Sequence, residues 1–101
     1  MNADDFGLNQ EALAKILLIL GHLDGLEQAV IYGSRAMGTY RPASDIDLTL
    51  IGPSLTTTDL LKVENELDDL LLPYQFDLSL YSQIENNDLI EHIQKFGKRI
   101  L

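Results

Sequence analysis

Three aspartates and a glycine–serine pair are the residues whose types and spacing could do chemistry in this sequence. Gly33 and Ser34 are separated by ten residues from Asp45, and Asp47 follows two positions later. A glycine lets a ligand approach the backbone closely, and a helical turn begun at Ser34 would direct free N–H groups at a phosphate. Carboxylates bind Mg²⁺, commonly together with substrate phosphates. The stretch therefore predicts chemistry on a nucleotide.

Asp77 supplies a third carboxylate of the same kind. Residues 45–51 and 75–81 alternate between apolar and polar side chains, which predicts two strands with one face in the core. Asp45 and Asp47 then share the outer face of the first strand, and Asp77 lies on the outer face of the second. If the strands are neighbours, the three carboxylates meet and could bind two metal ions that clamp an in-line displacement. Taken separately, each aspartate is better explained as a solvated strand residue than as a metal ligand.

The elements expected to position these residues follow the order helix, strand, turn, strand, helix, strand, helix. This order predicts an α/β (α+β) fold in which helices pack on one face of a short mixed β-sheet, as a single domain over residues 1–101. Ser82 is expected to cap the last helix, and one of Thr56, Thr57 and Thr58 the helix before it. The expected helices cover 8–23, about 56–72 and 88–96, the strands cover 27–32, 45–51 and 75–81, and a helical turn covers 35–38.

Composition narrows the classes of partner and location. The formal net charge is −9, and the seven Lys and Arg residues form no cluster, so direct binding of nucleic acid is not expected. The longest apolar run, Ile16 to Leu20, is too short to span a bilayer, and the acidic first residues do not resemble a signal peptide. We therefore expect a cytoplasmic protein without membrane association. His22 and His92 are expected to be surface or capping residues.

The spacing of Gly33, Ser34, Asp45 and Asp47 matches the G-S-x10-D-x-D signature of the DNA polymerase beta-like nucleotidyltransferases. From about Leu8 to its last residue the chain resembles a minimal nucleotidyltransferase (MNT) domain. This small prokaryotic subgroup often serves as the antitoxin beside a HEPN-domain toxin. The resemblance implies the polymerase beta palm-like nucleotidyltransferase fold.

The resemblance also implies roles for the carboxylates. Asp45 and Asp47 would ligate two Mg²⁺ ions, and Asp77 would ligate the catalytic ion and help to activate the acceptor hydroxyl.

On the nucleotide side, ATP would be the substrate, with Gly33 and Ser34 at its β- and γ-phosphates. Arg35 and Arg41 are candidates for further triphosphate contacts, and a surface salt bridge explains Arg41 equally well. Met37 stands where many relatives have a basic residue.

The implied function is transfer of AMP from ATP to a tyrosine of a small all-helical HEPN-type protein encoded next door, which silences that toxin. A chain of this size leaves no residues for an acceptor-binding domain, so we expect a heteromeric complex or a homodimer. Two alternatives stay open: a non-catalytic antitoxin that neutralises its partner by occlusion, and the catalytic subunit of a two-chain small-molecule nucleotidyltransferase.

Overall fold

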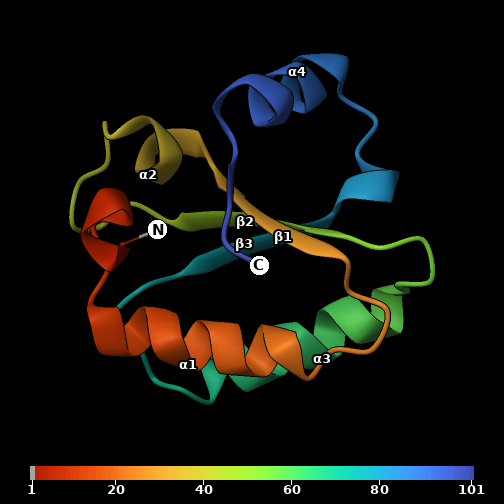
Figure 1. The fold of residues 1–101 in the computed structure, drawn as a ribbon, viewed down its shortest axis with the longest axis horizontal. Coiled ribbons are helices and arrows are strands. Elements are labelled where there is room, and N and C mark those ends of the chain that lie inside the picture. Colours follow the sequence, from red (N-terminus) through yellow and green to blue (C-terminus); the bar gives the residue numbers. More distant parts are fainter. Residues whose placement is uncertain (1) are drawn as a thin grey trace.

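A four-stranded mixed sheet forms the centre of the structure, a computed structural model that describes residues 2–101 (Figure 1). The strand order is β3-β2-β1-β4. β2 runs antiparallel to β1 and parallel to β3, and β4 pairs antiparallel with β1 at the other edge. The strands are β1 (Gln28–Tyr32), β2 (Ile46–Ile51), β3 (Phe76–Leu80) and β4 (Lys98–Arg99).

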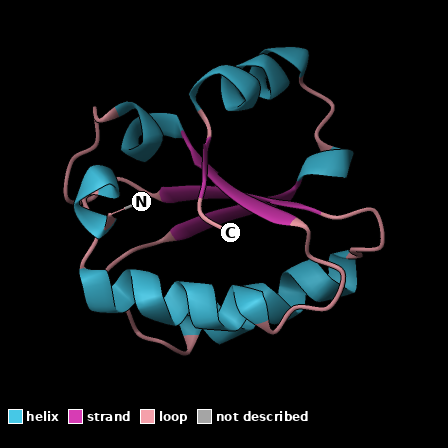
Figure 2. Ribbon diagram, viewed as in Figure 1, coloured by secondary structure: helices cyan, strands magenta, loops and turns pink. Residues whose placement is uncertain are grey.

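Helices lie on both sides of this sheet (Figures 1 and 2). On one face, α1 (Gln10–Gly21) and α3 (Thr57–Asp68) cover the main core, which includes Ile16, Leu48 and Leu67. On the opposite face, α4 (Asn87–Phe96) packs Ile93 against Val30, next to the short helix α2 (Gly33–Met37). The α+β class with a short mixed sheet is confirmed, and the placement of α4 adds a helix on the face that was expected to be bare.

Side-chain caps explain where the helices begin. The Asn9 side chain accepts the N–H groups of the first turn of α1, and Thr56 forms a reciprocal capping box with Asp59 at the start of α3. The prediction that Ser82 caps the last helix is wrong. Asn86 accepts the first N–H groups of α4 instead, whereas Ser82 lies in the 3-10 turn η2 (Tyr81–Gln83).

Several local features depart from the expected elements. The 3-10 helix η1 (Ala3–Phe6) and the strand β4 were not predicted, and α3 ends at Asp68 rather than near Leu72. β4 has only two residues, too few for an alternation pattern. Within residues 2–101, no helix is both long enough and apolar enough to cross a membrane.

Candidate active site

Asp47 and Asp77 lie side by side on the sheet face opposite α1 and α3, hereafter the carboxylate face. They are direct partners in the parallel register of β2 and β3. Tyr32 is the antiparallel partner of Asp47 on β1, so it borders the same patch. Asp45 is exposed just before β2, two residues from Asp47. The sheet thus brings Asp47 and Asp77 together and places Asp45 at their edge.

The electrostatics of this patch are those of crowded negative charge. The pKa of Asp47 is raised, first by partial burial and then by the charges of Asp77 and Asp45, and His92 and Arg35 oppose the rise. Burial also raises the pKa of the Tyr32 hydroxyl, with Asp77 and Asp47 contributing and a hydrogen bond with Ser79 opposing. Asp77 and Asp45 therefore destabilise the charged form of Asp47, a cost that a bound cation would remove.

The carboxylates fit Mg²⁺ by the chemistry of their donors, since hard cations prefer oxygen ligands and Mg²⁺ is usually held by one or two carboxylates plus phosphates. Over residues 2–101, however, no group of three or more His, Asp or Glu side chains is gathered closely enough to hold a metal ion. A cation at Asp47 and Asp77 would thus need phosphate oxygens or water to complete its coordination.

Gly33 brings the backbone against the Asp47 carboxylate. Its φ of +71° lies in the left-handed region, which a side chain disfavours. A Cβ built at Gly33 would collide with Oδ2 of Asp47 and lie 3.1 Å from its Cγ. Only glycine therefore permits this approach between the turn and the carboxylate face. Ser34 follows at the half-buried start of α2.

His92 also contacts the candidate site, and the sequence did not reveal it. The Gly33 N–H donates a hydrogen bond to its Nε2 at 3.0 Å. The imidazole meets the Tyr32 ring edge-on at 6.1 Å between centroids and packs on Phe96 at 5.3 Å. His92 is half-buried and not on the surface, because α4 folds back over α2 and β1; the expected capping role holds, since the ring accepts the first N–H of α2. No local pattern signals this long-range packing.

Arg35 does not face the carboxylates as a free phosphate ligand would. Its side chain is 1% exposed, and its guanidinium lies between the rings of Tyr40 and Tyr74 at 5.4 and 5.1 Å. The guanidinium donates to the carbonyl oxygens of Phe6, Gly7, Pro42 and Ser44, at distances from 2.8 to 3.4 Å.

With its donors directed at backbone carbonyls, Arg35 holds η1 and the loop before Asp45 together. This conformation argues against the expected triphosphate contact. Arg41 remains exposed on that loop, where its backbone N–H donates to the Ser44 hydroxyl at 2.8 Å.

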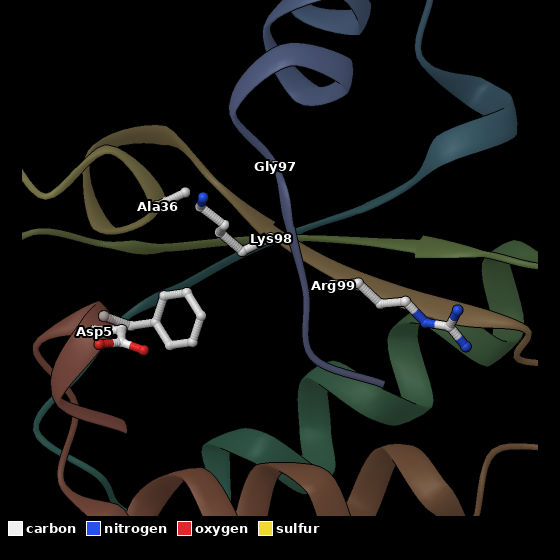
Figure 3. A pocket seen from close by; sticks show the side chains of 6 residues that line it. Asp5, Ala36, Gly97, Lys98 and Arg99 are labelled. Atoms are coloured by element: carbon white, nitrogen blue, oxygen red, sulfur yellow. The ribbon is translucent and has the colours of Figure 1, made fainter. Parts of the chain in front are cut away.

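A separate cavity of about 440 Å³ lies between η1, α2 and β4 (Figure 3). Lys98 extends toward Ala36 on one side of it, whereas Arg99 extends the opposite way. The remaining lining residues are Asp5, Phe6 and Gly97. None of the three candidate catalytic aspartates lines this cavity, so it is distinct from the carboxylate face.

Comparison with known proteins agrees with the geometry. The family described as Polymerase beta, Nucleotidyltransferase matches residues 14–101. No curated protein matches the chain. Among solved structures, similar chains occur in a toxin–antitoxin complex with AMP-PNP, where the identity is 23%, 88% of this chain and 72% of that chain are covered, and the TM-score is 0.71.

Two further complexes have the same fold. One is the MntA–HepT toxin–antitoxin, with 19% identity, 92% and 72% coverage of the two chains and a TM-score of 0.67. The other is the tri-AMPylated HEPN toxin of Shewanella oneidensis in complex with its MNT antitoxin, with 19% identity, 91% and 71% coverage and a TM-score of 0.67.

Proposed function

The chain belongs to the polymerase beta nucleotidyltransferase family, and from this premise we propose that it transfers AMP from ATP to a tyrosine hydroxyl of a HEPN-type partner and so acts as an antitoxin. Residues 1–101 would form the single catalytic domain. The partner class is supported by the similar fold of chains in toxin–antitoxin complexes, one of which contains an AMPylated HEPN toxin.

The observation that carries this proposal is the pairing of Asp47 with Asp77 on the carboxylate face, with the Gly33 turn against Asp47. Burial and the neighbouring charges of Asp77 and Asp45 raise the pKa of Asp47, and a bound divalent cation would relieve this repulsion. A turn that can meet phosphates lies directly beside them. Metal and nucleotide would therefore meet at one place.

In the proposed reaction, the acceptor oxygen attacks the α-phosphorus of ATP, the bond from that phosphorus to the bridging oxygen breaks, and pyrophosphate leaves. Asp47 and Asp77, with Asp45 at their edge and phosphate oxygens completing the coordination, would hold Mg²⁺, which would neutralise the charge on the triphosphate. Asp77, which is exposed at the patch, would take the proton of the attacking hydroxyl. Positioning and charge stabilisation supply most of the catalysis in such transfers.

On the phosphate side, Gly33 and Ser34 would contact the β- and γ-phosphates, and Arg41 would approach the triphosphate from its exposed position in the loop. Arg35 would act indirectly, since its bonds to Pro42 and Ser44 fix the chain that leads into Asp45. A buried arginine with several hydrogen bonds to carbonyls holds a loop more firmly than a lysine could.

Label transfer from α-labelled ATP to the partner tests the proposal. We expect wild type to label the partner in the presence of Mg²⁺, and Asp45→Asn/Asp47→Asn to lose the labelling. The matched control is Asp68→Asn/Asp69→Asn, which removes the same charge from two exposed aspartates at the end of α3. Equal labelling by wild type and the site double variant would refute the catalytic role.

The same variants separate catalysis from occlusion. A double variant that binds the partner normally but fails to protect cells from it would exclude neutralisation by occlusion alone. Full protection by that variant would favour the non-catalytic antitoxin. Labelling of a small molecule in place of the partner protein would favour the two-chain small-molecule enzyme.

A further inference from the structure

The imidazole of His92 lies at the position where the Gly33 turn would meet an anion. Its Nε2 accepts the Gly33 N–H at 3.0 Å, and its ring borders Tyr32, the register partner of Asp47. α4 thus places a side chain from the last third of the sequence directly on the phosphate side of the site.

This hydrogen bond and a phosphate contact exclude one another. A backbone amide has one proton to donate, so a phosphate oxygen that takes the Gly33 N–H must replace Nε2. An imidazole that accepts at Nε2 carries its proton on Nδ1, and therefore it has no proton at Nε2 to offer to the incoming oxygen. The charged phosphate is the stronger acceptor, so the Gly33 N–H can change its acceptor from Nε2 to a phosphate oxygen when the nucleotide binds.

Building on the proposed function, we propose that His92 is a positioning residue that occupies the Gly33 N–H in the nucleotide-free chain and releases it when a triphosphate binds. The hydrogen bond to His92 stabilises the Gly33 turn in the nucleotide-free chain, but it also competes with the triphosphate for the Gly33 N–H. The ring contacts with Tyr32 and Phe96 fix its orientation.

The test compares ATP binding in the presence of Mg²⁺ by the whole chain and its variants, measured by titration calorimetry. His92→Phe keeps an aromatic ring against Tyr32 and Phe96 but removes the acceptor. We expect it to tighten Kd about fivefold, the equivalent of one ordinary hydrogen bond. His92→Gln restores an acceptor and is expected to bind ATP close to wild type. The matched control is His22→Phe, because the wild-type His22 imidazole contacts the Leu18 carbonyl oxygen on α1 and not the site. This variant should leave Kd unchanged.

A spectroscopic readout separates competition from a purely structural role. In wild type, addition of ATP and Mg²⁺ should shift the ¹⁵N resonance of His92 Nε2 away from its hydrogen-bonded position, together with the Gly33 amide signal. Unchanged or weaker binding by His92→Phe, or an Nε2 resonance unmoved by bound ATP, would overturn the inference and leave the proposed function standing. If ATP binds to neither wild type nor variants, the nucleotide site itself is wrong, and both proposals fail.

Discussion

Replacing Gly33 by alanine should separate the conformational role of this glycine from its role beside Asp47. The matched control is Gly38→Ala, at the other end of the same helix α2. Both glycines have left-handed backbones, with φ of +71° and +79°. A Cβ at Gly33 collides with the Asp47 carboxylate, whereas a Cβ at Gly38 meets nothing within 4 Å.

The two variants should lose similar stability. A side chain in the left-handed region costs about 1–2 kcal/mol, and the lower entropy of the unfolded alanine chain offsets about 0.4–1 kcal/mol of it. The collision at Gly33 involves the far end of the Asp47 side chain, which can rotate away. We therefore expect each variant to be destabilised by about 1 kcal/mol, with the two values agreeing within about 0.5 kcal/mol.

Activity should distinguish the two variants sharply. Displacing the Asp47 carboxylate moves a proposed metal ligand by an ångström or more, a misplacement that can cost about 10²-fold in rate. Gly38→Ala moves no side chain of the site and should keep most of the activity. Stability is measured by urea unfolding followed by circular dichroism, since the chain has no tryptophan, and activity is measured by label transfer from ATP to the partner.

One result would refute this reasoning. If Gly38→Ala loses as much transfer activity as Gly33→Ala at equal stability, backbone strain in α2 accounts for the loss, and the contact with Asp47 does not. Full activity of Gly33→Ala would likewise show that the close approach of turn and carboxylate has no catalytic role.

Three further predictions address Arg35, the charge at Asp47 and the proposed cation. Arg35→Lys should lower the free energy of unfolding by about 3 kcal/mol, because a lysine cannot satisfy four carbonyls from one position. The exposed Arg41→Lys should change it by less than about 0.5 kcal/mol in the same urea titration. Asp47→Asn should stabilise the fold near neutral pH by less than about 1 kcal/mol, since Asp47 is only partly buried. Its raised pKa means that the folded wild type binds this proton more tightly than the unfolded chain, so wild-type stability falls as pH rises above the ordinary Asp value of about 3.9. Unfolding at several pH values should show the gain disappearing in acid, and a variant less stable than wild type at neutral pH would contradict the sign. Chelation of Mg²⁺ should abolish label transfer and leave the circular dichroism spectrum unchanged, and transfer that survives chelation would count against a metal-dependent reaction.

The sequence predicted the strands well because alternation is a local property. Asp47 and Asp77 lie on one face of the sheet, and their chain neighbours Leu48 and Leu78 lie on the other, as the period of two requires. The same alternation, together with the parallel pairing of β2 and β3, explains why the two carboxylates meet. The pairing of β2 with β3 is a long-range event that alternation does not determine, so the meeting of the carboxylates follows from the sequence only if the two strands are neighbours.

Arg35 and His92 show what local pattern cannot provide. An arginine next to a candidate phosphate-binding turn has the same sequence pattern whether its guanidinium points toward solvent or into the protein. Its inward direction depends on η1 and on Tyr74, and no local pattern indicates that either lies beside Arg35. His92 likewise reaches Gly33 only because α4 packs over α2.

The parallel pairing of β2 with β3 has a consequence for the order in which the chain folds. β1 and β2 form an antiparallel pair linked through α2, whereas Asp77 joins Asp47 only after the crossover through α3 has closed. Closing a long crossover is slower than forming a local pair. A partly folded chain, or one still emerging from the ribosome, would therefore present Asp45 and Asp47 without Asp77. The complete carboxylate set thus forms only after this crossover has closed, so a partner that needs all three aspartates would engage the chain from that stage on and not before.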